Sequence, residues 1–238
     1  MHSFQIIMPY IFLTTFTVLM IEKNVSYSHT NSYTTLNKLS KNTKNVWIVF
    51  HGMGYLSRYF VNYFKELPPD ENYIIAPQAP SKYYQDKRFR YVGASWLTKE
   101  GTETDTHNIF NYLDTLWEEE LRAIDTNTVK IVLMGYSQGV SIVTRWIASR
   151  KIDCDYLLLH SGAVPSELKA SNFKHLTDKT VVTYIYGNKD EYITEARVTE
   201  QQLIGKSLFG NKLNVVVFPG PHEVHTPYLL KIVTALKE

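Results

Sequence analysis

Cysteine is nearly missing from this sequence, since the 238 residues include only Cys154. A single cysteine excludes an intramolecular disulfide and, with it, a disulfide-stabilised scaffold. The sequence also lacks a group of cysteine and histidine residues at the spacing that structural zinc sites require. We therefore expect a functional site with no metal and no other cofactor.

An excess of positive or negative charge is absent as well. Lysine and arginine together number 25, and aspartate and glutamate 23, so the formal net charge is +2. Proteins that bind nucleic acids or anionic surfaces through charge usually carry a strong positive excess. The balance gives no reason to expect a nucleic-acid partner.

Long hydrophobic runs are scarce, and the one substantial example lies at the N-terminus. Residues 4–21 are largely apolar, but Gln5, Pro9 and three threonines interrupt them. A membrane-spanning helix needs about 20 apolar residues, which makes this run marginal. A secretory signal peptide needs a positively charged start and a small-residue cleavage site, and the segment shows neither.

Three interpretations of residues 1–21 stay open: a weak signal or membrane anchor, a segment packed on the domain, or the product of an upstream start codon with Met20 as the true first residue. We favour the last, because the pattern of a folded domain begins near residue 22. We thus expect one domain over 22–238, a cytoplasmic location, and membrane contact only through residues 4–21. A membrane-associated or exported protein is the alternative, and the oligomeric state stays open.

The sequence does contain the composition and periodicity of a globular α/β domain. Hydrophobic residues make up 44% of the chain and charged residues 20%, which is ordinary for a protein with a sizeable core. The predicted strands are 46–50, 73–76, 129–134, 156–159, 180–186 and 213–218, and the predicted helices are 58–67, 105–124, 140–146, 193–208 and 228–236. This alternation predicts a mainly parallel, twisted sheet with helices on both faces.

Three local features complete the expected organisation. Residues 25–35 alternate and are rich in Thr, Ser and Tyr, which indicates a solvent-facing edge strand. Ser57 is expected to cap the helix that starts at residue 58. Residues 81–103 look irregular, and a loop of this length in a compact domain usually has a function or is mobile.

The motif with the most chemical content is Gly135-Tyr136-Ser137-Gln138-Gly139, between a predicted strand and a predicted helix. Strand, G-x-S-x-G and helix in this order describe a nucleophile elbow, a sharp turn that lifts the serine hydroxyl above the sheet. The alternative is a glycine-rich turn whose serine only caps the helix.

Two other strand ends carry residues that complete such a site. Asp190 follows the strand 180–186, and His222 follows the strand 213–218. Ligands of parallel sheets bind beyond the carboxyl ends of the strands, and Ser, Asp, His is the chain order of an α/β-hydrolase triad. We expect Ser137 to act as the nucleophile, His222 as the general base and Asp190 as the group that orients the imidazole.

Alternatives exist for two of these assignments. Asp190 stands in a turn-forming Asn-Lys-Asp sequence, and Glu191 is the first substitute for it as the acid. His225 competes with His222, but Thr226-Pro227 indicates a helix start that places His225 at the helix threshold. The remaining candidates His107, His160 and His175 are expected to be structural or exposed.

The developing oxyanion requires hydrogen-bond donors that are already aimed at it. The backbone N–H of Gln138 is one candidate, and the N–H of Met53, in the loop after the strand 46–50, is the other. The aromatic residues of 81–103 either line an acyl pocket or pack as core. Trp96 is the best single pocket candidate among them, and Tyr136 of the elbow is the second.

Several motifs together resemble the phospholipase/carboxylesterase family of α/β-hydrolases, which includes the acyl-protein thioesterases. The matching pieces are Phe50-His51-Gly52-Met53-Gly54, Ala76-Pro77-Gln78-Ala79-Pro80, Ser95-Trp96, the elbow, Ser161-Gly162, Gly187-Asn188-Lys189-Asp190 and Gly220-Pro221-His222-Glu223. The resemblance implies the α/β-hydrolase fold, a triad of Ser137, Asp190 and His222, and an oxyanion hole at Met53 and Gln138. Val140 departs from the family, where another glycine often stands.

The expected function is a serine hydrolase that cleaves carboxylic esters or thioesters through an acyl-enzyme on Ser137. Its partner would be a small-molecule or lipid acyl ester or thioester. A lysophospholipase or other lipid esterase is the alternative among enzymes. A non-catalytic binding protein that keeps the fold is the alternative from another class.

Overall fold

The computed structural model describes residues 19–122 and 124–237. Within the described part of the segment that ends at Thr30, residues 19–30 form neither helix nor strand. Residues Asn31–Glu238 form a compact unit by themselves, and the account below concerns this unit. Most of the apolar run 4–21 lies outside the described residues. No helix in the described ranges has the length and apolarity needed to cross a bilayer.

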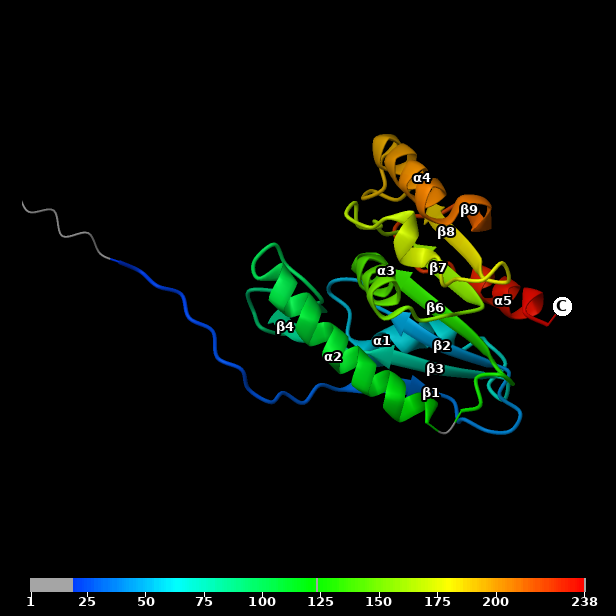
Figure 1. The fold of residues 1–238 in the computed structure, drawn as a ribbon, viewed down its shortest axis with the longest axis horizontal. Helices are drawn as coiled ribbons and strands as arrows, with labels where there is room; N and C mark the ends of the chain where they lie inside the picture. The colour runs from blue at the N-terminus through cyan, green and yellow to red at the C-terminus, as the bar shows by residue number, and fades with distance from the viewer. Residues whose placement is uncertain (1–18, 123, 238) are drawn as a thin grey trace, which may run out of the picture. The chain divides into compact units, whose positions relative to one another are not determined.

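The unit is built on a sheet whose described strands follow the order β1-β3-β2-β6-β7-β8-β9 (Figure 1). The strands are β1 (Tyr33–Leu36), β2 (Asn45–Phe50), β3 (Asn72–Pro77), β6 (Lys130–Tyr136), β7 (Tyr156–His160), β8 (Val181–Gly187) and β9 (Leu213–Phe218). Only β1 runs antiparallel to its neighbour, and the other pairs are parallel. The carboxyl ends of β6, β8 and β9 therefore lie along one edge of the sheet.

Helices cover both faces of the sheet, as predicted. The α-helices are α1 (Ser57–Phe60), α2 (Thr102–Leu121), α3 (Gln138–Arg150), α4 (Glu195–Phe209) and α5 (Thr226–Ala235), and the 3₁₀ helices are η1 (Val61–Phe64), η2 (Ala170–Phe173) and η3 (Gly210–Lys212). One buried cluster joins α2, α3 and α4 to the sheet. A second buried cluster joins α1, η1 and α5 to the opposite face.

Alternate residues of the central strands supply the two cores. Val46, Ile48 and Phe50 of β2 belong to the first cluster, while Trp47 and Val49 belong to the second, and all five are fully buried. A parallel strand covered on both faces has no solvent side, which is why β2 is a continuous apolar run. Burial on both faces fixes the register of the sheet and hence the position of its carboxyl edge.

The structure differs from the sequence-based expectations in three places. The edge strand is Tyr33–Leu36 rather than 25–35. The helix expected over 58–67 consists of α1 followed by η1, and Leu56 rather than Ser57 occupies the N-cap position. Ser57 is the first helical residue, and its hydroxyl bonds with the Thr34 hydroxyl at 2.9 Å.

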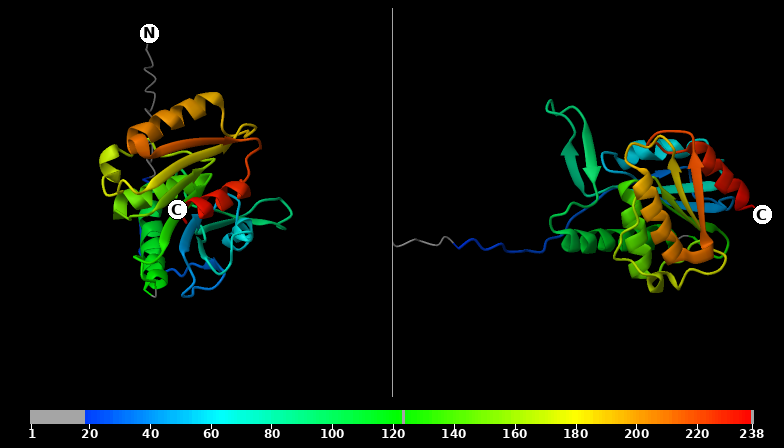
Figure 2. Two further views of the ribbon diagram at one scale, coloured as in Figure 1. Left: turned by 90° about the vertical axis from the view of Figure 1, so that its right-hand side faces the viewer. Right: turned by 90° about the horizontal axis from the view of Figure 1, so that it is seen from above.

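The segment 81–103 is more regular than expected. It contains an antiparallel hairpin of β4 (Ser81–Tyr84) and β5 (Val92–Ser95), which forms its own small sheet and projects from the body of the unit (Figure 2). The prediction of an irregular loop was wrong because neither four-residue strand shows the alternation of a half-buried strand: β4 is exposed throughout, and β5 is buried at its last three residues.

Candidate active site

Ser137 sits on a sharp turn between β6 and α3. Its backbone angles are φ 52° and ψ −117°, a conformation that residues with a side chain rarely adopt. The Ser137 side chain does not cap the helix, so the interpretation of the motif as a simple cap is not supported. Gly139 makes the turn possible, because a Cβ there would lie 2.2 Å from the Phe50 carbonyl oxygen. The geometry is that of a nucleophile elbow.

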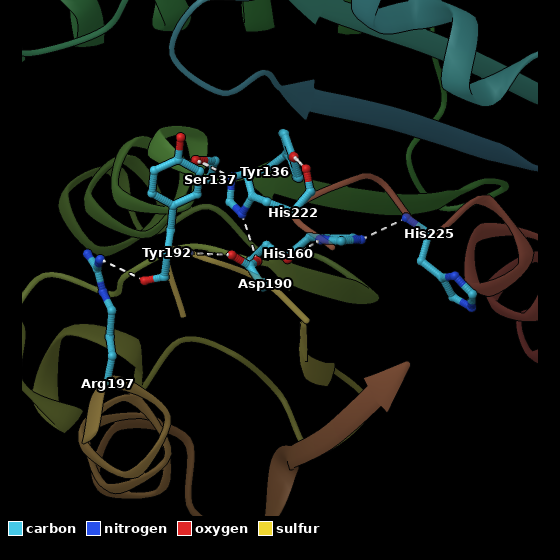
Figure 3. Close-up of polar contacts among 9 residues, drawn as sticks. Tyr136, Ser137, His160, Asp190, Tyr192, Arg197, His222 and His225 are labelled. Atoms are coloured by element: carbon cyan, nitrogen blue, oxygen red, sulfur yellow. Dashed lines mark hydrogen bonds and ion pairs between the residues drawn. The ribbon is translucent and has the colours of Figure 1, made fainter. Parts of the chain in front are cut away.

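The sheet edge brings Ser137, His222 and Asp190 into one hydrogen-bonded chain (Figure 3). His222 Nε2 lies 3.0 Å from Ser137 Oγ, and His222 Nδ1 lies 2.7 Å from Asp190 Oδ2. The Asp190 side chain is fully buried, while that of His222 is 17% exposed. An acceptor carboxylate at Nδ1 places the proton of the neutral imidazole on Nδ1 and leaves Nε2 free to accept the serine proton.

The loops that carry Asp190 and His222 are held against each other by the main chain. The Asn188 N–H donates to the Phe218 carbonyl at 2.9 Å, and the Lys189 N–H donates to the Gly220 carbonyl at 2.9 Å. The second carboxylate oxygen, Asp190 Oδ1, accepts the Tyr192 N–H at 2.9 Å. With both oxygens bonded, the carboxylate has a fixed orientation toward the imidazole.

The competing residues lie elsewhere. Glu191 is exposed and lines the cavity described below without taking part in the chain of hydrogen bonds. His225 is the N-cap residue of α5, as its expected place at the helix threshold implies. Its ring stacks on Phe218, with centroids 4.3 Å apart and planes 10° apart, and points away from Ser137 (Figure 3).

The two residues predicted to supply the oxyanion donors, Met53 and Gln138, both line the cavity beside Ser137. Gln138 is the first residue of α3, where helical N–H groups have no intrahelical partner. Met53 follows Gly52 in the loop after β2, and Gly52 lies against Ser137, since a Cβ on it would be 3.0 Å from Ser137 Cβ. Within the described residues, neither the Met53 N–H nor the Gln138 N–H donates to another protein group.

The Gln138 side chain performs a role that the sequence analysis missed. Its Oε1 accepts the Trp96 N–H at 2.8 Å, and its Nε2 donates to the Leu97 carbonyl at 2.8 Å. The Trp96 indole N–H in turn donates to the His51 carbonyl at 2.8 Å. These bonds connect the segment after β5 to Gln138 and to His51, at the start of the loop that carries Met53. The Ser95-Trp96 pair was the sequence signal for this link, but it indicated only a pocket residue.

A cavity of about 550 Å³ opens beside Ser137. Its lining comprises Gly52, Met53, Tyr55, Tyr136, Ser137, Gln138, Ser141, Ser161, Gly162, Ala163, Glu191, Tyr192, Ile193, Arg197 and His222. The predicted pocket residue Tyr136 is among them. Trp96 is not, because it is fully buried and packs against Phe50 and His51 beneath the site. For Trp96 the structure thus supports the core alternative over the pocket hypothesis.

The hairpin aromatics do not line this cavity either. Tyr83, Tyr84, Phe89 and Tyr91 are between 39% and 69% exposed and lie along the projecting hairpin (Figure 2). Tyr192 lines the cavity instead, and its ring makes an edge contact with the His222 ring, with the ring centroids 4.8 Å apart. Arg197 Nη1 donates to the Tyr192 carbonyl at 3.2 Å and holds that segment in place. Tyr192 and Arg197 follow Asp190 in the chain, where no periodic pattern singles them out.

Two buried histidines beside the site are held in the neutral form. Burial lowers the pKa of His51 to about 4 and that of His160 to about 3. His51 Nε2 accepts the Ala79 N–H at 3.1 Å, which requires the proton to be on Nδ1, where it bonds to the Gly52 carbonyl at 2.8 Å. His51 therefore fixes the loop that carries Met53. Among residues 19–122 and 124–237, no cluster of three or more His, Cys, Asp or Glu side chains could hold a metal ion.

Comparisons with known proteins identify the family and the fold of the chain. The sequence model of the phospholipase/carboxylesterase family matches residues 31–237. No curated protein matches the chain. Among solved structures, a Zea mays acyl-protein thioesterase 2 is 12% identical, with a TM-score of 0.65 over 88% of this chain and 100% of that one.

Two bacterial structures have TM-scores close to that of the Zea mays protein. A phospholipase/carboxylesterase from Dyadobacter fermentans is 21% identical, with a TM-score of 0.63 over 90% of this chain and 100% of that one. A carboxylesterase from Mesorhizobium loti is 12% identical, with a TM-score of 0.63 over 80% of this chain and 88% of that one. At these identities the structural likeness establishes the α/β-hydrolase fold.

Proposed function

The chain belongs to the phospholipase/carboxylesterase family of α/β-hydrolases, and from this premise we propose that it is a serine hydrolase that cleaves carboxylic esters or thioesters through an acyl-enzyme on Ser137. The observation that carries the proposal is the chain of hydrogen bonds from Ser137 Oγ through His222 to Asp190. A serine hydroxyl is a weak nucleophile by itself, and an adjacent oriented base is what activates it.

The first half of the reaction forms the acyl-enzyme. Ser137 Oγ attacks the carbonyl carbon while its proton passes to His222 Nε2. The carbonyl oxygen becomes an oxyanion and accepts the N–H groups of Met53 and Gln138. When the carbon–oxygen or carbon–sulfur bond to the leaving group breaks, His222 returns the proton to the departing alcohol or thiol. Asp190 stabilises the imidazolium throughout.

The second half releases the acid. A water molecule attacks the acyl carbon, and His222 Nε2 takes its proton as before. Breaking the bond to Ser137 Oγ frees the carboxylic acid, and the proton on His222 restores the serine hydroxyl. The cycle consumes one ester or thioester and one water and requires no cofactor.

The direct test is labelling with a fluorophosphonate probe together with steady-state kinetics. We expect the probe to label the wild type and not Ser137→Ala, and kcat of that variant to fall by about 10⁵–10⁶-fold. Ser149→Ala, an exposed serine on the same helix, is the matched control and should behave as the wild type. Labelling that persists in Ser137→Ala would refute the assignment. An unlabelled, inactive wild type would favour the non-catalytic binding protein.

A substrate panel separates the ester classes. p-Nitrophenyl esters of increasing acyl length, acyl thioesters and lysophospholipids differ in leaving group and in lipid character. The substrate with the largest kcat/KM identifies the preferred substrate class. The ratio of kcat/KM between two substrates measures how much better the enzyme stabilises one transition state than the other. A preference for lysophospholipids over the other two would select the lipid-esterase alternative.

A further inference from the structure

The segment His222–His225, between β9 and α5, carries the general base and is held at both ends by side chains from neighbouring strands. At its start, the Tyr136 hydroxyl donates to the His222 carbonyl at 2.9 Å. At its end, the His225 N–H donates to His160 Nε2 at 3.0 Å. Tyr136 ends β6 and His160 ends β7, so two adjacent strands hold the segment (Figure 3).

His160 is an unusual residue for its location. It follows Leu157, Leu158 and Leu159 in β7 and is itself fully buried. An imidazole costs free energy in such a place unless its polar atoms are bonded. Both are: Nε2 accepts the His225 N–H, which leaves the proton on Nδ1, and Nδ1 donates to Ser161 Oγ at 3.1 Å. An apolar side chain would fill the space without binding the segment.

The protonation state of His160 favours this role. Burial, with smaller contributions from the nearby His222 and His225, lowers its pKa to about 3. The ring is therefore neutral over the working range of a hydrolase, and Nε2 keeps the lone pair that accepts the His225 N–H. The His160 ring also packs against Tyr136 and Phe218, which restricts its rotation.

We propose that His160 is a positioning residue for the general base: its Nε2 anchors the end of the segment His222–His225 and keeps His222 in register with Ser137 and Asp190. This inference rests on the proposed serine-hydrolase function. His222 lies in a loop, and its 3.0 Å contact with Ser137 depends on where that loop is held. A displacement of about 1 Å at a catalytic group costs about 100-fold in rate.

A pair of amide variants tests the anchor with little change in chemistry. In His160→Gln, the side-chain amide oxygen lies about as far from the backbone as histidine Nε2. In His160→Asn, the amide oxygen lies only about as far from the backbone as histidine Nδ1. Both variants bury a carboxamide, and they differ by one methylene, so only the longer side chain places its oxygen where it can accept the His225 N–H. His175→Gln is the control, since His175 bonds the Ile152 carbonyl, beyond the opposite end of β7.

We expect kcat of His160→Asn to fall 10- to 100-fold with KM changed less than threefold, and His160→Gln to stay within threefold of the wild type. The proton NMR signal of the His222 Nδ1–H, in its bond to Asp190, should stay sharp in the Gln variant and broaden in the Asn variant. The thermal midpoint identifies a temperature at which both variants are fully folded for these measurements.

Equal kcat and equal His222 signals in two folded amide variants would overturn the proposal, as would a loss of similar size in the His175 control. If the Asn variant does not fold, hydrogen exchange of the His225 amide in the wild type carries the test. The His225 N–H that donates to His160 Nε2 should exchange slowly with solvent, and exchange as fast as that of an unstructured amide would overturn the proposal. The NMR signal is independent of turnover, so an inactive wild type would refute the proposed function, while the His222 signals of the two variants would still decide whether His160 holds the segment.

Discussion

At the scale of single residues, four histidines near the sheet edge have four different environments. His51 and His160 are fully buried, and their low pKa values keep them neutral acceptors. His222 bridges Ser137 and Asp190. His225 occupies the N-cap position of α5 without a capping side-chain bond, and its ring stacks on Phe218. The same imidazole group thus serves as a structural acceptor or as the candidate base according to its partners and its burial.

This difference predicts contrasting effects for His222→Ala and His225→Ala. Loss of the base should lower kcat nearly as much as loss of Ser137, because the triad acts as a unit. Removing the His225 ring should leave kcat mostly intact, since the backbone N–H that His160 accepts is kept. We expect only a small loss of stability from the lost stacking, about 1 kcal/mol.

The measurement is steady-state hydrolysis of a p-nitrophenyl ester by both variants, with thermal unfolding as a check of folding. An inactive His225→Ala beside an active His222→Ala would reverse the assignment of the base.

At the scale of elements, the hairpin of β4 and β5 separates two groups of aromatic residues that are close in the chain. Phe89, near the turn, is 69% exposed, and its ring contacts only that of Tyr84 among the described aromatic pairs. Trp96, just after β5, is fully buried and bonded to the His51 carbonyl. β5 leads the chain from the exposed turn of the hairpin to the buried Trp96.

Trp96→Ala and Phe89→Ala should therefore differ in stability. Deleting a fully buried tryptophan side chain costs about 3–5 kcal/mol of unfolding free energy, because it removes buried surface and leaves a cavity. Substituting an exposed aromatic costs within about 0.5 kcal/mol. Urea unfolding of both variants measures the difference.

Acyl-chain preference gives an independent readout on the same variants. Because neither residue lines the cavity, Phe89→Ala should keep the wild-type ratio of kcat/KM between short and long esters. If Trp96→Ala is stable and its ratio of kcat/KM between short and long esters changes more than tenfold, the hypothesis that Trp96 lines the pocket would be correct after all.

At the scale of the whole molecule, the buried neutral histidines link stability to pH. In the folded state the pKa of His51 is about 4 and that of His160 about 3, against about 6.5 in the unfolded chain. A lowered histidine pKa means that the unfolded chain binds more protons as the pH falls. The stability from these groups is therefore full above about pH 6.5 and is lost toward pH 4 and 3.

We expect each buried histidine to lower the free energy of unfolding by about 2 kcal/mol between pH 7 and pH 5. The lowered carboxyl pKa values of Glu71, Asp86 and Asp178, each from a lysine or arginine partner or backbone N–H groups, act in the same direction at lower pH. Urea unfolding at pH 7 and pH 5 measures the total change.

Substitution identifies the group responsible for this pH dependence. His160→Gln should show about 2 kcal/mol less change than the wild type between the two pH values. His107→Gln, which replaces an exposed histidine on α2, should show the full change. An unaltered change in His160→Gln would mean that His160 takes up no proton on unfolding.

The amino-acid sequence by itself was sufficient for the architecture and for the positions of the candidate triad. Continuous apolar runs mark the parallel strands of the main sheet, and the predicted limits of these six strands agree with the structure to within two residues. Residues that follow such runs must meet at one sheet edge, which is why Ser137, Asp190 and His222 could be grouped before any coordinates. These features depend on local periodicity and on the chain order of the strands.

Only the tertiary structure decided which side chains face one another. It distinguished His222 from His225 by the direction of each ring, and it showed Trp96 to be core although its neighbours in the chain are exposed. It also revealed the bonds of Gln138 to Trp96 and of His160 to the His225 backbone. Such contacts join residues 42 and 65 positions apart in the chain. The physical reason is that side-chain partners are chosen by packing in three dimensions, on which the periodicity of a single segment carries no information.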